Sequence, residues 1–533
     1  MSNRDITTAL EFHELTKHSY TSVRTSTHRL DLHNRPYPFK VYLEAKRVEL
    51  PREFPKPSLP TLEALAGKNL REKRGELDIA GLAEILYFSA GITRVLRNPL
   101  GEFYFRAAPA TGALYPIELY IVSGDIPGLR AGVYHFDPGE FILNTLREGD
   151  YRDYLSRAAG EEQAVRDAPA TVVMTSIAWR NAWKYQVRSY RHWFWDSGVI
   201  AANMLAVSVS EMIGARVIMG FVDEMVNKLL CVGGSVEEAA IALIPLAASA
   251  GEKAPKKRRR VSQEEHKTMP LSRYIINYPA IWQMHKVSSL TSVEEVKEWR
   301  GQRVEQVEDN YEGETYKLEG WDDVSSPPLW ETILKRGSTR RFAQKPISEK
   351  HLATILGYST RGLDADFLNS GASLIDVYLI ASSVDGIPAG AYYYDRKNST
   401  LLLLKRGAFR RIAGYLCLEQ KLGEDASVVF FLMTRLNQVL RRLGNRGYRA
   451  CQFEAGVVAG RMYLAAYALG LGATGLTFYD DEITEFLSPH AREKSNMLTV
   501  AVGFPAYKAR SGEILLGVVK HERRMEYPQI GRG

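Results

Sequence analysis

Hydrophobic and polar positions follow the same order of patterns in the two halves of this 533-residue chain. β-branched runs bounded by turn residues predict strands at 117–122 and 171–176, and residues 132–137 predict a third strand that leads into a turn. Apolar residues three and four positions apart predict helices over 197–213 and 455–470. Helices and strands mixed in this order indicate an α+β fold.

A constant register between the halves indicates a duplicated domain. The segment Gly-Val-Tyr-His-Phe-Asp at 132–137 recurs as Gly-Ala-Tyr-Tyr-Tyr-Asp at 390–395, 258 positions later. Further matches at this offset pair Ile117–Tyr120 with Ile375–Tyr378, Tyr190-Arg191 with Tyr448-Arg449, and Asp223-Glu224 with Asp481-Glu482. Upstream, Leu82–Leu86 matches Leu352–Leu356 at offset 270, so the first copy carries 12 extra residues, which we place in a loop over 94–105.

These matches, with a length that exceeds one ordinary domain, predict four segments. They are an N-terminal lead-in (1–59), a first domain (60–250), a charged linker rich in Ser, Glu and Lys (251–327), and a second domain (328–533). Within the linker, a helix is expected at 292–299.

Charge and cysteine usage argue against several classes of function. The formal net charge is +7, but Lys256–Arg260 supplies five charges and no nucleic-acid-binding motif accompanies it, so no nucleic-acid partner is expected. The spacing of Cys231, Cys417 and Cys451 suits neither a disulfide framework nor a metal site. The sequence shows no signal region and no run of about 20 uncharged apolar residues, so we expect a cytoplasmic protein with no membrane partner.

Residues 470–475 fit the dinucleotide-binding pattern Gly-x-Gly-x-x-Gly, but their context does not. That pattern binds a dinucleotide when it follows a strand and opens a helix, whereas here it closes a helix and leads into a strand-like run at 476–479. We therefore predict a turn that ends the helix, whose glycines could also admit a flat ring close to the backbone.

A basic segment opens the second domain and could hold a phosphate. Arg336, Ser338 and Arg340 alternate along Arg-Gly-Ser-Thr-Arg-Arg-Phe, so two guanidinium groups and a hydroxyl could surround a phosphate dianion through charge-assisted hydrogen bonds. A solvated basic turn explains the same composition equally well.

Together these residues resemble the nitroreductase-like flavoproteins, whose opening motif is close to Arg-x-Ser-x-Arg-x-Phe. Within that superfamily the chain is similar to the SagB/ThcOx (McbC-like) dehydrogenases, whose Arg-x-x-Pro-Ser-x-Gly segment matches 106–112, with Ala110 in place of the serine. Residues 12–17 and 35–40 look like the N-terminal lead-in of that subgroup. The resemblance implies two FMN-binding domains that form an intramolecular pseudo-dimer, with each FMN site assembled from both domains.

The resemblance implies one complete FMN site, called site A below. Its cofactor-binding residues would be Arg336, Ser338, Arg340, Lys508 and Arg510 at the phosphate, Gly472, Thr474 and Gly475 beside the ring, and Pro109, Thr111 and Gly112 in the cover. The second site, site B, is degenerate, because Asn69 replaces the serine of its clamp (68–71) and its cover (367–371) lacks the proline. One FMN per chain is therefore expected.

The resemblance also implies a catalytic pair. Azole-forming members are associated with a Lys-Tyr pair for proton abstraction, which matches Lys184 and Tyr185, whereas the second domain has Arg442 and Leu443 at these positions. Removing hydrogen across a C–C bond requires a base as well as a hydride acceptor. A tyrosine with a pKa of about 10 is a poor base unless a nearby ammonium favours the phenolate. The alternative is an exposed lysine beside a buried tyrosine.

Three functions stay open. The leading one is an FMN-dependent dehydrogenase that oxidises an azoline (thiazoline or oxazoline) to an azole, with a small-molecule or modified-peptide substrate and other peptide-modifying enzymes as partners. The second is a general NAD(P)H-dependent reductase of nitro compounds or quinones, which needs no protein base. The third is a flavin-free scaffold that binds a peptide or a partner. The sequence leaves the substrate and any further oligomerisation open.

Overall fold

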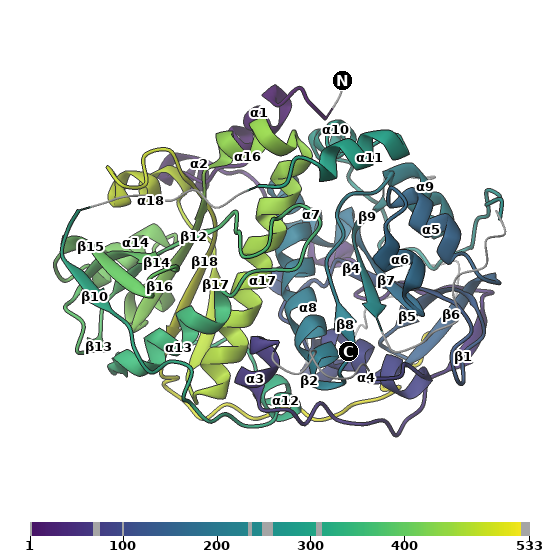
Figure 1. Cartoon of the computed structure of the whole chain (residues 1–533), viewed down its shortest axis with the longest axis horizontal. Helices are drawn as coiled ribbons and strands as arrows, with labels where there is room; N and C mark the ends of the chain where they lie inside the picture. The colour runs from purple at the N-terminus through teal and green to yellow at the C-terminus, as the bar shows by residue number, and fades with distance from the viewer. Residues whose placement is uncertain are drawn as a thin grey trace.

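The computed structural model describes residues 3–67, 75–98, 101–232, 237–247, 259–304 and 312–523. These residues form two α+β units side by side, each built on one seven-stranded sheet (Figure 1). The strand orders are β1-β6-β5-β4-β7-β9-β8 and β10-β15-β14-β12-β16-β18-β17, and neighbouring strands pair antiparallel throughout. The two orders correspond strand for strand, which confirms the predicted duplication.

The strands of the first sheet are β1 (Lys46–Glu49), β4 (Ile117–Ser123), β5 (Gly132–Asp137), β6 (Ile142–Glu148), β7 (Ala170–Ile177), β8 (Gly214–Ala215) and β9 (Glu238–Ala247). Those of the second sheet are β10 (Thr315–Lys317), β12 (Asp376–Ala381), β14 (Gly390–Asp395), β15 (Thr400–Arg406), β16 (Val428–Thr434), β17 (Gly472–Leu476) and β18 (Ser495–Gly503). β11 (Ile347–Ser348) and β13 (Val384–Asp385) form a separate parallel pair. The strands predicted at 117–122, 132–137 and 171–176 correspond to β4, β5 and β7.

The helices repeat in the same way. The first unit contains α3 (Thr61–Ala66), α4 (Ile79–Ala90), α5 (Arg152–Ala158), α6 (Gln163–Asp167), α7 (Ala178–Tyr185), α8 (Ser189–Ser210) and α9 (Asp223–Leu229). The second contains α12 (Leu329–Lys335), α13 (Glu349–Ser359), α14 (Arg410–Leu416), α15 (Lys421–Asp425), α16 (Leu436–Leu443), α17 (Arg446–Ala468) and α18 (Asp480–Leu487). None of the described helices is long and apolar enough to cross a membrane.

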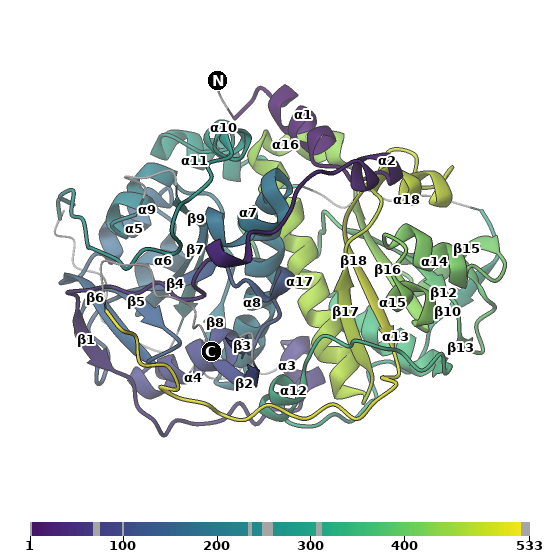
Figure 2. The ribbon, with the colours of Figure 1, turned by 180° about the vertical axis from the view of Figure 1, so that it is seen from behind.

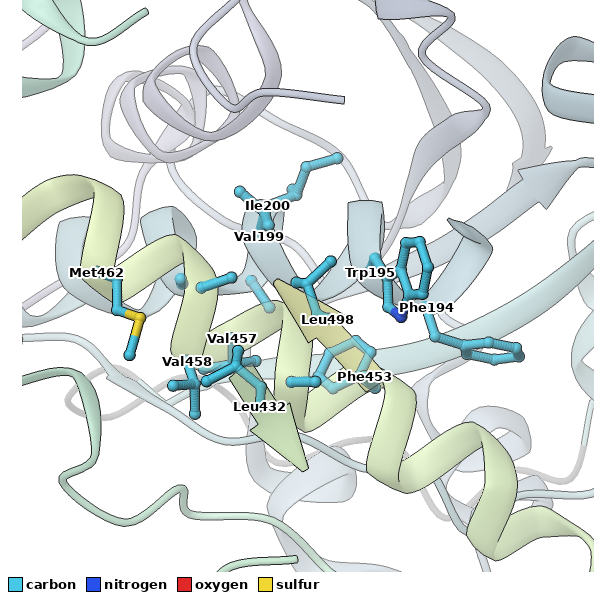
Figure 3. Close-up of a cluster of buried hydrophobic side chains, with 14 of the residues drawn as sticks. Phe194, Trp195, Val199, Ile200, Leu432, Phe453, Val457, Val458, Met462 and Leu498 are labelled. Carbon is cyan, nitrogen blue, oxygen red and sulfur yellow. The ribbon is translucent and has the colours of Figure 1, made fainter. Parts of the chain in front are cut away.

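The interface between the units is formed by α8 and α17, which cross between the two sheets (Figure 1). Both helices are buried over almost their whole length, and their apolar side chains gather at the crossing (Figure 3). A Cβ atom at Gly198 would lie 2.3 Å from the carbonyl oxygen of Phe453, and one at Gly456 would lie 2.5 Å from that of Trp195. The two glycines, which are equivalent in the repeat, therefore allow the backbones to approach closely.

The extra residues of the first copy form a hairpin. β2 (Ile92–Asn98) pairs with β3 (Gly101–Arg106), so the prediction of a loop over 94–105 is wrong. Neither strand alternates strictly between apolar and polar residues, since Val95 is followed by Leu96 and residues 103–105 are all aromatic, so no period-two pattern predicts this hairpin.

More of 251–327 is folded than its charged composition indicates. Besides α11 (Val293–Arg300), which matches the predicted helix, it contains α10 (Pro279–Val287) and β10. β10 extends the second sheet as β1 extends the first. Buried apolar residues such as Met284 and Trp299 anchor the two helices. Within the basic run 256–260, only Arg259 and Arg260 are among the described residues.

Segments outside the sheets tie the units together. The N-terminal α1 (Thr7–Leu15) and α2 (Tyr20–Arg24) lie over α16 and α18 of the second unit, although they precede the first (Figure 2). After β18 the chain leaves the second unit and crosses to the first, where the amide of Val519 donates to the carbonyl of Gly139 at 3.1 Å (Figure 2). Each unit is therefore covered in part by a segment that adjoins the other unit in sequence.

Candidate functional site

Site A forms where the segment 336–342 of the second unit meets the segment 106–112 of the first. The Arg336 guanidinium is buried and donates from Nε to the carbonyl of Ala107 at 2.9 Å and from Nη2 to that of Arg106 at 2.7 Å. Burial lowers the pKa of Arg336. Two of its nitrogens are thus engaged by backbone, so Arg336 fastens the predicted phosphate clamp to the predicted cover.

The other clamp residues lie nearer to solvent. Ser338 is partly buried, with its Oγ 3.4 Å from the hydroxyl of Tyr463. Arg340 is exposed, and its backbone amide donates to the hydroxyl of Tyr507 at 3.1 Å. Lys508 is also exposed, and Arg510 lies 3.4 Å from the carboxylate of Glu513. Arg340 and Lys508 therefore offer cations at the rim of this site.

Glycines hold the clamp against β17. The predicted turn at 470–475 is only partly a turn, because Gly470 has a φ of +76° but Gly472–Leu476 already forms the strand. The amide of Thr339 donates to the carbonyl of Ala473 at 3.0 Å, and the amide of Gly475 donates to the hydroxyl of Tyr463 at 2.6 Å. The predicted ring-binding residues and the clamp thus belong to one hydrogen-bonded assembly.

Replacing Gly472 by Ala is expected to lower the affinity for the FMN that the resemblance implies by about tenfold or more. The added Cβ would lie 2.1 Å from the Thr339 Oγ1, which contacts the hydroxyl of Tyr467 at 3.2 Å, so the clamp would have to move. Titration of the flavin-free protein with FMN, followed by flavin fluorescence, measures this. The matched control is Gly214→Ala at the equivalent position of the first unit, where the nearest atom is 3.4 Å away. Equal affinities of the two variants would contradict the prediction.

The cover is held by a carboxylate that the sequence did not single out. Asp196, buried on α8, accepts from the backbone amide of Thr111 at 2.9 Å and from its hydroxyl at 2.7 Å. Pro109 and Asp196 line one small cavity, and Gly112 has a φ of +63°. Glu454 plays the same role in the second unit, where it accepts from the amide of Leu374 at 2.9 Å. The sequence signal for this role was an acidic residue at the same position of both long helices, Asp196 in α8 and Glu454 in α17.

Burial raises the pKa of Asp196 to about 7, against an ordinary value of 3.8. The folded state therefore binds the carboxyl proton of Asp196 more tightly than the unfolded state does. The stability gained from protonated Asp196 is fully present below about pH 4 and is lost as the pH rises through 7. Relative to Asp196→Asn, the wild type is expected to lose on the order of 3 kcal/mol of unfolding free energy between pH 4 and 8. Urea titrations across this range measure the difference, and parallel pH dependences would contradict it.

The predicted catalytic pair lies beside the cover. Tyr185 is the last residue of α7, and a Cβ at Gly112 would lie 2.7 Å from its hydroxyl oxygen. The Nζ of Lys184 lies 5.2 Å from the centre of the Tyr185 ring. Lys184 also lies within electrostatic reach of Arg340. The structure thus brings the pair, the cover and the clamp to one place.

The surroundings of the pair shift the two pKa values in opposite directions. Burial lowers the pKa of Lys184, and the cations Arg340 and Arg35 lower it further. Burial raises the pKa of Tyr185, and the carboxylate of Asp196 adds to this effect. The proximity of the ammonium therefore does not make Tyr185 a phenolate, and the better candidate for a base is Lys184.

Site B differs from site A because the backbone of residues 364–366 pairs with the segment that follows β8, at Val217. The amide of Val217, which follows β8, donates to the carbonyl of Asp364 at 2.9 Å, and the amide of Asp366 donates back to Val217 at 3.1 Å. The Asp366 carboxylate accepts from the amides of Met219 and Gly220, each at 2.9 Å. The residue of site A that is equivalent to Val217 is Gly475. The predicted clamp of site B, 68–71, lies outside the described residues.

The chain is similar to several known proteins. It is 28% identical over 183 residues to a nitroreductase-like protein of Methanocaldococcus jannaschii, a match that covers 33% of this chain and 91% of the relative. It is 32% identical to the trifolitoxin-processing protein TfxB of Rhizobium leguminosarum and 30% identical to the microcin B17-processing protein McbC of Escherichia coli. These matches cover 25% and 24% of this chain, and 39% and 48% of the two relatives.

A crystal structure of a nitroreductase-like protein from Anabaena variabilis superposes on most of the chain. The TM-score is 0.75 at 26% identity, and the match covers 93% of this chain and 99% of the other. The family model for nitroreductases matches residues 79–247 and 333–504, which contain most of the two sheets and both helices of the interface. On this evidence the chain belongs to the nitroreductase family, with two such domains in tandem.

Proposed function

We propose that this protein is an FMN-dependent dehydrogenase that oxidises a peptide-borne azoline to an azole in site A. The observation that carries the proposal is the meeting of Lys184 and Tyr185 with the cover and with Arg340 of the other unit. Relatives named for processing trifolitoxin and microcin B17 support a peptide substrate and other peptide-modifying enzymes as partners. Membership of the nitroreductase family supports an oxidoreductase.

The donor set of site A suits FMN. Arg340 and Ser338 would bind its phosphate, with Lys508 at the rim, and β17 at Gly475 would lie beside its ring. Both ring nitrogens of the buried His192 lack a partner among the described residues, and its ring centre lies 4.5 Å from that of Tyr185. When bound, FMN would supply the acceptor for a hydride.

The remaining chemistry belongs to the protein. Converting an azoline to an azole removes a hydride from one carbon and a proton from its neighbour, and a new C=C bond forms between them. The neutral amine of Lys184 would take the proton and become an ammonium. Tyr185, packed against Gly112, would hold the substrate edge and the cover in register. Asp196 would fix the cover through Thr111.

We further propose one FMN per chain. The support is a difference between Val217 in site B and its equivalent, Gly475, in site A. Residues 364–366 cover Val217 through backbone hydrogen bonds. A flavin in site B would have to displace them. Site A has no such cover at Gly475 within the described part of the chain, where Tyr463 alone accepts from the amide.

A single anaerobic experiment tests this function. The flavin released per chain is first quantified, and the flavin-loaded protein is then mixed with an azoline-containing peptide or, separately, with NADPH. The proposal predicts about one FMN, bleaching of the flavin by the peptide, and a product lighter by two hydrogens in mass spectrometry. Rapid bleaching by NADPH alone would instead assign a nitro or quinone reductase, and a colourless protein that takes up no FMN would assign a scaffold.

A further inference from the structure

A groove of about 730 Å³ lies on the second unit, and none of its lining residues belongs to site A. It runs between the end of α13, the segment 369–372 and the turn that follows β14. Its volume is that of an ordinary ligand-binding site. Arg361 at one end stacks on Trp321, with the guanidinium carbon 5.3 Å from the ring centre, and Lys397 is exposed at the other.

The duplicated fold shows what such a groove can hold. In the first unit the equivalent surface is occupied by residues 513–521 of the chain itself, in a conformation without helix or strand. The amide of Leu515 donates to the hydroxyl of Tyr87 at 3.0 Å. Further along, Val519 donates to the carbonyl of Gly139, and His521 pairs with Asp137 at 3.0 Å. This surface therefore accommodates an extended peptide.

The second groove contains no such segment among the described residues. By the repeat, the residues that follow β9 are the counterparts of those that follow β18. Where they are described again, at 259–272, they lie on the first unit, because Leu43 donates to the carbonyl of Lys267 at 3.0 Å and Met269 to that of Val41 at 2.9 Å. The continuous chain thus fills one of two equivalent grooves.

The turn that receives Val519 has the same backbone geometry in both grooves, although Gly357 stands in the second unit where Tyr87 contacts Leu515 in the first. The Asp137 carboxylate accepts from the amide of Gly139 at 2.8 Å, and the equivalent Asp395 accepts from that of Lys397 at 3.0 Å. Phe141 and Ser399, which are also equivalent, share a positive φ, of 59° and 51°. The carbonyl of Lys397 is therefore positioned as the acceptor that Gly139 provides in the first unit.

The charge of the groove has changed between the copies. Lys397 replaces Gly139, Arg361 replaces Gly91, and Asn398 stands where Glu140 pairs with Arg523 in the first unit. Every one of these differences makes the second groove more positive. Two acids line the groove. Asp376 pairs with Lys494 at 2.8 Å, and the Asp395 carboxylate accepts from the amides of Lys397 and Asn398.

We propose that this groove binds an extended, acidic segment of another polypeptide. The backbone of that segment would donate to the carbonyl of Lys397, as Val519 does to Gly139, and its carboxylates would face Lys397 and Arg361. The site is separate from site A and does not depend on the flavin reaction.

The test uses the purified full chain and fluorescence anisotropy. Three labelled peptides are compared: ten residues of alternating Glu and Val, the same with Lys in place of Glu, and a peptide with the sequence of residues 512–523. The acidic peptide is expected to bind most tightly and to weaken with added salt. Lys397→Glu and Arg361→Gln are each expected to weaken it by about fivefold.

The matched control is Lys350→Glu, which reverses an exposed charge on α13 outside the groove and should leave binding unchanged. Circular dichroism verifies that each variant is folded. The proposal is overturned if the acidic peptide does not bind, if the basic peptide binds as well, or if Lys397→Glu changes nothing. Tighter binding of the 512–523 peptide would also overturn it, since the occupant would then be a second copy of this chain.

Discussion

Replacing Lys184 by Met is expected to lower the turnover of the proposed azoline oxidation by about 100-fold or more while the proposed FMN stays bound. Met keeps the length and the apolar stem of the side chain but cannot accept a proton. The rate is measured at saturating substrate by mass spectrometry of the azole, and the flavin content by absorbance. Because only the neutral amine acts as a base, the wild-type rate should rise with pH through the pKa of Lys184, which burial and Arg340 place below its ordinary value of 10.5. This rise should disappear in the variant.

The duplicated chain offers a matched control for this prediction. Arg442 occupies the position of Lys184 in the second unit, where its Nε donates to the carbonyl of Gln302 at 3.1 Å, so Arg442→Met should leave turnover unchanged. Tyr185→Phe keeps the amine and should have a smaller effect than Lys184→Met. If Lys184→Met turns over at the wild-type rate with its flavin in place, Lys184 is not the base.

Replacing Asp223 by Ala is expected to lower the free energy of unfolding by about 3–5 kcal/mol. Asp223 of the first unit bonds Nη1 of Arg446 at 2.6 Å and Nη1 of Arg449 at 2.7 Å, both from the second. All three groups are buried, so the variant would leave two guanidinium groups without their carboxylate in a region that excludes water. Urea unfolding of the full chain, with transitions followed by fluorescence and circular dichroism, measures the change.

A second, equivalent triad strengthens this prediction. Asp480 of the second unit bonds Nη1 of Arg188 at 2.8 Å and Nη1 of Arg191 at 2.6 Å, so Asp480→Ala should cost a similar amount. These two arginines hold the pKa of Asp480 well below its ordinary value despite burial. Its stabilising effect is therefore complete above about pH 4 and is lost as the pH falls through the folded-state pKa.

Asp481 is the control for both triads. Its side chain is 60% exposed and pairs with Lys17, and the loss of such a surface pair costs less than about 1 kcal/mol. A loss of this small size in Asp223→Ala would show that the triads do not hold the units together.

The triads also show where comparison of the two copies failed. The constant offset pairs Asp223 with Asp481, but the structure shows that Asp480 is the counterpart, since each begins its helix and each pairs with two arginines of the other unit. A carboxylate one position away looks equivalent in sequence. Only the partners across the interface distinguish the buried group from the exposed one.

The charged composition of residues 251–327 also hid the helices that this segment contains. The charged residues of 251–327 indicate a linker, yet Met284 and Trp299 are buried and His285 and Ser288 reach the arginines of the second unit, since the carbonyl of His285 and the hydroxyl of Ser288 accept from Arg449. A few buried side chains are enough to anchor a short helix, and their signal is diluted by charged neighbours.

The sequence by itself determined the duplication, the strands at 117–122, 132–137 and 171–176, and the two long helices of the interface, because repeats and residue spacing are properties of the chain alone. Its motifs also indicated the family. It also predicted that the proposed clamp, the proposed cover and the Lys184-Tyr185 pair share one site. The tertiary structure alone decided what each group contacts there: Arg336 bonds carbonyls, Asp196 accepts from Thr111, and burial and Arg340 lower the pKa of Lys184. These outcomes depend on burial and on partners 85 or more residues away in the sequence, and no local pattern encodes either.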